Sequence, residues 1–166
     1  YKGEGWFRNT LFVFSADHVS SEKYAEKTHT TVGGKRIVLF YYAPDGSLQG
    51  RSPHVTQQLD IMPTVLGLVG YRESYFAFGR DVFGEHVRMP MSVNPVGSCQ
   101  IITDSLSMRF NADSRSVIDV FSMADTLQVN NIANPADPYQ QRMQLGLEAF
   151  LQQYYDHIEA RSYVVP

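Results

Sequence analysis

An aspartate and a histidine stand side by side where an apolar run ends near the start of the chain. The segment LFVFSADHVS, residues 11–20, places Asp17 and His18 directly after a row of hydrophobic residues. A carboxylate and an imidazole are ordinary ligands of a divalent metal ion. In an open α/β sheet, ligands bind beyond the carboxyl ends of the strands. The position and the residue types therefore suit one part of a metal site.

The same pair also suits a simpler interpretation, the polar end of a strand. Successive strand side chains point to opposite faces, so Asp17 and His18 can reach one ion only if the chain turns at Asp17. Otherwise they would serve two neighbouring ions. A catalytic ion typically takes about three protein ligands plus water, and the pair supplies two. The residues alone favour the polar strand end.

The elements that would position the pair follow an α/β pattern. Residues 10–17 and 35–43 are short apolar runs, typical of strands buried on both faces. The polar segment 19–34 predicts a surface excursion, with a helical turn near residues 21–26. Apolar residues at spacings of three and four within 54–71 predict one kinked helix, or a turn followed by a helix. The order strand, excursion, strand, helix favours an α/β fold with a mainly parallel sheet flanked by helices.

The pattern changes in the second half of the chain. Three short runs separated by brief polar junctions predict strands joined as antiparallel hairpins, at residues 98–104, 106–112 and 116–123. Residues 135–162 predict a long amphipathic C-terminal helix introduced by proline.

Composition excludes several classes of protein and site. The net charge of -3, without any cluster of Lys or Arg, offers no electrostatic footprint for nucleic acid. The single cysteine, Cys99, excludes an internal disulfide and a cysteine-based zinc site. No apolar run approaches the roughly 20 residues that cross a bilayer. The first residues have neither an initiator Met nor signal-peptide features, which favours a chain cut from a longer protein.

Three segments, in order, resemble a known family. NTLFVFSADHVS, VGGKRIVLFYYAPDGSLQG and VTQQLDIMPTVLGLVGY resemble the C-terminal part of the sulfatase-like branch of the alkaline phosphatase superfamily. The nearest members are the lipoteichoic acid synthase-like, or phosphoglycerol transferase-like, membrane sulfatases of bacteria. YFAFGRDVF and LEAFLQQYYDHI extend the resemblance over essentially the whole chain. The ordered series is far more specific than any single motif, and it reverses the preference for a polar strand end.

The resemblance implies a metal-dependent hydrolase or transferase acting on phosphate or sulfate esters. Asp17 and His18 would bind the catalytic divalent ion, Mn, Mg, Ca or Zn. The nucleophile, a Thr, Ser or formylglycine, would lie upstream of residue 1, so this chain alone would be inactive. Residues 1–166 would form a single domain, the C-terminal part of a larger catalytic domain, with an α/β core at 1–84 and antiparallel strands and a helix at 85–166.

The resemblance also implies a substrate and a location. The substrate would be an anionic phosphate or sulfate ester, possibly linked to a lipid or a glycan. The parent would act outside the cytoplasmic membrane, anchored by N-terminal spans. His29 stands where the family often has a basic residue and could contact the anion when protonated, although an exposed loop histidine without such a role is the preferred interpretation. Val38 departs from the proline that the family usually has there.

The other polar residues fit structural roles better than chemical ones. Asp60 is interpreted as a cap at the start of a helix and Asp45 as part of the PDGS turn. Cys99 is expected to be buried. His54 is interpreted as a capping or solvent-facing residue, and His86 and His157 as surface residues.

Two other functions stay open. A non-catalytic module could bind a partner through the hairpins and the C-terminal helix, and a missing nucleophile in the upstream sequence would favour it. The second alternative is a nucleotide-binding α/β domain, which only the predicted fold class supports. If the N-terminal half of the sheet is absent, the exposed sheet edge predicts a homodimer of the isolated chain.

Overall fold

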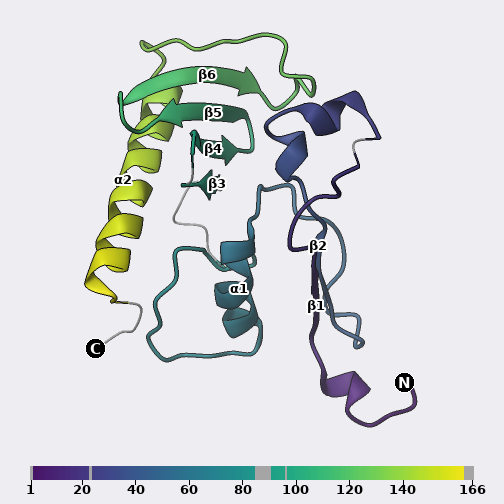
Figure 1. Cartoon of the computed structure of the whole chain (residues 1–166). Coiled ribbons are helices and arrows are strands. Elements are labelled where there is room, and N and C mark those ends of the chain that lie inside the picture. Colours follow the sequence, from purple (N-terminus) through teal and green to yellow (C-terminus); the bar gives the residue numbers. More distant parts are fainter. Residues whose placement is uncertain (1, 23, 85–90, 96, 163–166) are drawn as a thin grey trace. The chain divides into compact units, whose positions relative to one another are not determined.

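The chain folds into two units, which a computed structural model describes over residues 2–22, 24–84, 91–95 and 97–162 (Figure 1). Unit 1 is Tyr1–Pro53 and unit 2 is His54–Pro166. The interpretation of His86 as a surface residue falls outside the described residues. The prediction that the whole chain is one domain, cut from a larger catalytic domain, stays a prediction.

Unit 1 is built on two short strands and three turns of 3-10 helix. The strands are β1 (Phe12–Ser15) and β2 (Leu39–Tyr42), and the turns are η1 (Phe7–Asn9), η2 (Glu26–His29) and η3 (Gly33–Lys35). β1 and β2 pair antiparallel, with Phe12 opposite Tyr42 and Phe14 opposite Phe40. Both strands are confirmed within the predicted segments. The helical turn of the excursion lies at η2, a few residues later than expected.

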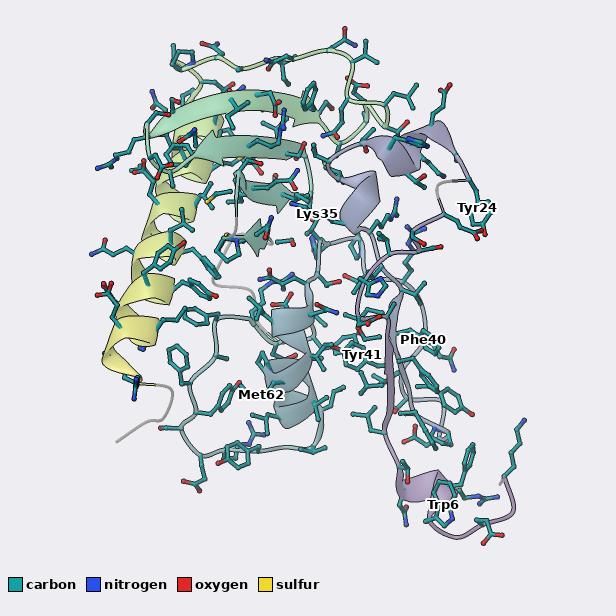
Figure 2. All side chains as sticks on the ribbon, in the orientation of Figure 1. Trp6, Tyr24, Lys35, Phe40, Tyr41 and Met62 are labelled. Carbon is teal, nitrogen blue, oxygen red and sulfur yellow. The ribbon has the colours of Figure 1, made fainter. Side chains whose placement is uncertain are left out.

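The mainly parallel sheet is not confirmed, because every strand pairing among the described residues is antiparallel. A parallel pair needs a crossover of a dozen or more residues, usually with an α-helix. Residues 16–38 instead fold back through η2 and η3 and return the chain beside β1. The expected burial of both strand faces is wrong for this chain as it stands, since Phe14, Phe40 and Tyr42 are 40–48% exposed. Figure 2 shows Phe40 and its neighbour Tyr41 on opposite sides of the sheet.

Unit 2 contains a four-stranded antiparallel sheet in the order β3-β4-β5-β6. Its elements are η4 (Gln58–Asp60), α1 (Ile61–Leu68), β3 (Met91–Asn94), β4 (Cys99–Thr103), β5 (Leu106–Asn111), β6 (Ser116–Ser122) and α2 (Pro138–Ala160). One face of the sheet packs against α2, which runs beside it in Figure 1. Ile101, Met108 and Val120 from the sheet meet Met143 and Leu147 from the helix, and none of the five is more than 1% exposed.

The α/β class, the antiparallel hairpins and the long C-terminal helix are confirmed. The helix α2 begins with Asp137 as its N-cap, whose side chain accepts hydrogen bonds from the N–H groups of Tyr139 and Gln140, and Pro138 occupies the first turn as expected. Of the two alternatives for residues 54–71, the turn followed by a helix is correct. The strand β3 was not predicted from the sequence, because MSVN is too short to show an alternation. No helix in the described part of the chain is long and apolar enough to cross a membrane.

The start of α1 is fastened to the segment that follows it. The Asp60 carboxylate accepts the N–H groups of Gln57, at 3.0 Å, and Arg80, at 2.9 Å. One turn later, Thr64 Oγ1 accepts the N–H of Val82 at 3.1 Å. Aspartate and threonine four residues apart lie on the same helix face. Together they hold the backbone of residues 80–82 against α1.

Candidate functional site

The chain bends at Asp17 and His18, directly after β1 ends at Ser15. A turn at this point is the condition under which both side chains could face one ion, and the structure has it. Both are highly exposed, with 88% of the Asp17 side chain and 77% of the His18 side chain accessible to solvent. The pair therefore lies at the surface of the chain, in contact with solvent.

Two hydrogen bonds and one longer approach describe how the two side chains lie. Asp17 Oδ1 accepts the backbone N–H of His18 at 2.9 Å. On the imidazole, Nδ1 lies 2.7 Å from the carbonyl oxygen of Val19. On its other side, Nε2 lies 3.5 Å from Asp17 Oδ2.

These contacts determine which ring nitrogen is available. A carbonyl oxygen only accepts hydrogen bonds, so His18 Nδ1 carries a proton and donates it to Val19. In the neutral ring, Nε2 then holds the lone pair that a metal or a proton would take. The 3.5 Å from Nε2 to Asp17 exceeds the usual N–H···O range of about 2.7–3.2 Å. A doubly protonated imidazole would form an exposed ion pair across the same gap.

A complete metal centre is not assembled within the part of the chain that the structure describes. No group of three or more His, Cys, Asp or Glu side chains there could hold an ion. His29, the last residue of η2, is exposed and does not complete a three-ligand set with Asp17 and His18. The assignment of Asp17 and His18 as ligands, and of His29 as a substrate contact, stays a prediction.

The turn at PDGS has the structure that its residues predict. Asp45 Oδ1 accepts the N–H of Ser47 at 2.9 Å and its hydroxyl at 2.7 Å. These bonds, the hydroxyl first, hold the pKa of the exposed Asp45 carboxyl below its ordinary value. Asp45 therefore serves the turn.

Asp60 is structural, although its partners differ from those of an ordinary helix cap. Its side chain closes a capping box with Gln57 at the start of η4 and makes no side-chain cap to α1. It is 1% exposed. Burial raises the pKa of the Asp60 carboxyl, although the N–H groups of Arg80 and Gln57 and the Arg80 charge oppose the rise. The interpretation of Asp60 as a cap at the start of a helix is confirmed for η4, where it belongs to the capping box, and is wrong for α1, to which its side chain makes no cap.

Two histidines have more contacts than their sequence contexts indicated. His54 Nδ1 lies 2.6 Å from Asp104 Oδ2, and Asp104 Oδ1 accepts the N–H of Val55 at 2.6 Å. His157 is half-buried, with its ring centroid 4.2 Å from that of Phe76. His54 is exposed, in agreement with the interpretation of a solvent-facing residue, although it also contacts Asp104. The interpretation of His157 as a surface residue is wrong, because its ring packs against Phe76. Asp104 and Phe76 lie far from these histidines in the sequence, where no local signal could have revealed them.

Cys99 was the subject of a sequence prediction, whereas the pairing of Arg109 with Asp119 was not. Cys99 is buried at 2% exposure, as predicted. The sequence did not reveal the pairing of Arg109 with Asp119, opposite residues on β5 and β6, whose guanidinium and carboxylate are joined by several hydrogen bonds. Asp119 raises the pKa of Arg109 further, so this arginine is a fixed positive charge already neutralised by its neighbour.

Comparison with known families supports a relationship for the part of the chain that carries Asp17 and His18. Residues 2–71 match the model of the family described as Sulfatase. The match covers β1, the bend, β2 and α1, and amounts to less than half of the 166 residues. It supports a relationship to the sulfatases and, through them, to the alkaline phosphatase superfamily. Among curated proteins, nothing matches this chain.

Proposed function

We propose that Asp17 and His18 are two ligands of a divalent metal ion in an enzyme that hydrolyses or transfers phosphate or sulfate esters. The observation that carries the proposal is the convergence of His18 Nε2 and Asp17 Oδ2, 3.5 Å apart, at a bend that follows a strand. The match of residues 2–71 to the Sulfatase family supports the reaction class. The resemblance of the A-D-H motif to lipoteichoic acid synthase-like enzymes supports the specific assignment.

The residues fit such an ion in donor chemistry. A carboxylate and a neutral imidazole are ordinary divalent-metal donors, and a ligating histidine usually donates its other N–H to a carbonyl or carboxylate. His18 makes that second bond to Val19. When bound, the ion would polarise the ester oxygens and neutralise charge that develops on them. The work of Asp17 and His18 is to hold and orient it.

The rest of the site belongs, in this proposal, to a larger protein. The nucleophile and the remaining acidic ligand lie outside residues 1–166, so the chain alone has no turnover. His29, exposed at the end of η2, is proposed to contact the anionic group of the substrate. The substrate is an anionic phosphate or sulfate ester, linked to a lipid or a glycan, and the enzyme acts outside the cytoplasmic membrane.

The proposal is tested by measuring turnover of phosphodiester, phosphomonoester and sulfate ester substrates, with and without Mn²⁺. The chain alone is compared with a longer protein that includes upstream sequence. We expect metal-dependent turnover in the longer protein only. Asp17→Ala and His18→Ala should each abolish it, and His29→Gln should weaken substrate binding with a smaller effect on kcat.

Two results would contradict the proposal. Metal-dependent turnover by the chain alone would show that the nucleophile is present within it. A longer protein that keeps its activity after Asp17→Ala or His18→Ala would remove both residues from the site. Upstream sequence without a Thr, Ser or Cys nucleophile and a second acidic ligand would favour the alternative, a non-catalytic binding module.

The two-stranded sheet of unit 1 also bears on the partners of the chain. β1 and β2 are both edge strands of their sheet, and neither contains a charged residue or a proline to discourage pairing. We propose that the remainder of the catalytic domain covers this sheet in the parent enzyme, and that the isolated chain dimerises across its edge. Sedimentation should show a dimer that dissociates on dilution, whereas a monomer at all concentrations would contradict the dimer.

A further inference from the structure

We propose that His157 makes the docking of one loop of unit 2 depend on pH. Protonation of its ring tightens residues 71–79 against the C-terminal end of α2, and deprotonation loosens them. This segment, called here the aromatic loop, joins α1 to the residues that Asp60 and Thr64 hold. The proposal concerns unit 2 alone and does not depend on the proposed function.

The inner and outer parts of the aromatic loop are held to different extents. Phe78 packs against the core of unit 2, with its ring centroid 5.4 Å from that of Phe150. The ring of Phe76 contacts those of Phe78, at 5.0 Å, and His157, at 4.2 Å. Residues 71–75, which precede it, are exposed. Phe78 is therefore the fixed end of the loop, and the contact between Phe76 and His157 decides whether the outer part stays docked.

His157 is anchored to the end of α2 in the same way whether or not it is charged. It lies in the last turn of the helix, and its Nδ1 lies 2.8 Å from the carbonyl oxygen of Ser162, just beyond the helix. A carbonyl oxygen only accepts hydrogen bonds, so Nδ1 carries a proton in the neutral ring. A second proton therefore goes to Nε2. Titration thus changes the charge of the ring without breaking its bond to Ser162.

The positive charge favours the closed loop through the two phenylalanine rings. A cation within about 6 Å of the centroid of an aromatic ring is attracted to the face of that ring. The imidazole centroid meets this limit for Phe76, at 4.2 Å, and for Phe78, at 5.8 Å. The C-terminal end of a helix also favours a cation. The imidazole is half-buried, which limits the opposing cost of removing water from the charge.

The other groups around the imidazole do not neutralise its charge. The aromatic loop presents Phe76 and Phe78 to it, and Ser162 presents its carbonyl and hydroxyl oxygens. Within the described residues, His157 forms no salt bridge. The ionisable residues nearest to it in sequence on α2, and those of the aromatic loop, are Tyr154, Tyr155, Asp156, Glu159, Arg161, Tyr71, Arg72, Glu73 and Tyr75. The added charge therefore acts on the phenylalanine rings and the helix end.

The test is NMR relaxation dispersion of the backbone amides of the aromatic loop in the whole 166-residue chain. The measurement gives the population of the open loop and is repeated between about pH 5 and pH 8, the range in which imidazole side chains ordinarily change charge. We expect the open-to-closed ratio to rise about two- to fivefold from the acid to the neutral end, the factor that one cation–π contact supplies.

Matched variants separate the charge of the imidazole from its ring. His157→Phe keeps an aromatic contact without a charge, so its loop should show no pH dependence. His157→Gln removes the ring, so its loop should be more open at every pH. Phe76→Leu should lose the pH dependence with the aromatic face, whereas Phe76→Tyr should keep it. His29→Gln, which removes an exposed histidine of unit 1, should change nothing. Helical circular dichroism checks that α2 stays folded in each variant.

Two kinds of result would overturn the proposal. The first is an open-to-closed ratio that stays constant across this pH range or rises toward acid pH. The second is a pH dependence that persists in His157→Phe or in Phe76→Leu, because another group would then carry it.

Discussion

The four-stranded sheet of unit 2 and the two-stranded sheet of unit 1 are both antiparallel, yet they differ in how their faces and edges are covered. In unit 2, α2 covers one face, and the outer strands have partners of their own. The N–H of Val93 on β3 donates to the Gln57 side chain at 3.0 Å. On β6, the carbonyl of Val120 accepts the N–H of Ile132 at 2.8 Å. The N–H of Val120 donates to the side-chain oxygen of Asn131.

In unit 1, one face of the two-stranded sheet carries a row of aromatic rings, and no α-helix in the described part of that unit packs on it as α2 packs on the sheet of unit 2. Phe12, Phe14, Phe40 and Tyr42 share one face, and the rings of Phe14 and Phe40 stack with centroids 4.6 Å apart. Three of the four are 40–48% exposed. A two-stranded sheet is marginally stable at best in water, and three or more strands or a packed helix are needed for independence. The sheet of unit 2 therefore has the strands and the packed helix that independent stability requires. The sheet of unit 1, which Asp17 and His18 follow, lacks both, and additional strands or a covering helix would stabilise it.

The largest expected difference between the units comes from removing one phenylalanine ring from each. Phe110, 1% exposed, lies in the core of unit 2. Phe110→Ala should cost about 3–5 kcal/mol of unfolding free energy, because it leaves a cavity. Phe14→Ala should cost about 0.5–1.5 kcal/mol, the value of one aromatic pair. Urea unfolding of both variants measures this, and equal losses would contradict the distinction.

A glycine of unit 2 offers the next largest effect. A Cβ on Gly79 would lie 2.0 Å from the backbone carbonyl oxygen of Leu59, so Gly79→Ala must push apart the segments that Asp60 and Thr64 hold together. Overpacking of this kind costs about 1–3 kcal/mol, occasionally more.

The matched control is Gly146→Ala in α2, where an added Cβ meets nothing within 4 Å. This change should stabilise the protein by about 0.5–1 kcal/mol, because glycine is a poor helix former. Thermal unfolding of the two variants should shift in opposite directions. A Gly79→Ala protein as stable as the parent would show that the two segments are not tightly packed.

Asp60→Asn tests the hydrogen bonds that hold the segment around Arg80 against the start of α1. The asparagine can accept one N–H, but its amide nitrogen would face the other donor. The unsatisfied bond should cost about 1–3 kcal/mol. Arg80 N–H exchange with solvent should accelerate together with the loss of stability. Unchanged exchange at Arg80 would indicate that Asp60 does not hold this segment.

The pH dependence of this effect has a definite sign. Burial raises the pKa of folded Asp60 above the ordinary value of about 4. The folded state therefore favours the protonated Asp60 carboxyl. The resulting contribution to the free energy of unfolding is fully present below the ordinary aspartate pKa and is lost as the pH rises through the raised pKa of the folded state. The advantage of the parent over Asp60→Asn should shrink across that interval. Unfolding curves measured at several pH values check it, and an advantage that grows with pH would reverse the sign.

The smallest effect is local to the turn of unit 1. Ser47→Ala removes the hydroxyl that contributes most to the lowered pKa of Asp45, so that pKa should rise toward its ordinary value. The backbone N–H of Ser47 remains, so part of the depression should persist. The lowered pKa makes a stabilising contribution above the ordinary aspartate pKa, lost as pH falls through the folded one. NMR titration of the Asp45 carboxyl measures the shift, and no change would assign the lowering to the backbone alone.

Elements with a clear local pattern could be predicted from the sequence, and tertiary pairings could not. The apolar runs gave β1 and β2, and the spacing of Met143, Leu147 and Phe150 gave α2 and its buried face. The antiparallel direction of β1 and β2 was missed, because apolar runs are the same for either direction. Asp17 and His18 were visible as neighbours. Their convergence was not, since it depends on a bend and on the Val19 carbonyl, for which residue types give no signal.

One measurement tests the contrast between the units most directly. Trp6, the single tryptophan, lies in unit 1, whereas the long helix α2 lies in unit 2. Urea unfolding followed by tryptophan fluorescence and by helical circular dichroism therefore reports on the two units separately. The account predicts that the Trp6 transition comes at lower urea and that Mn²⁺, the ion used in the turnover test, shifts it upward without moving the helix transition. Superimposed transitions that Mn²⁺ leaves unchanged would contradict it.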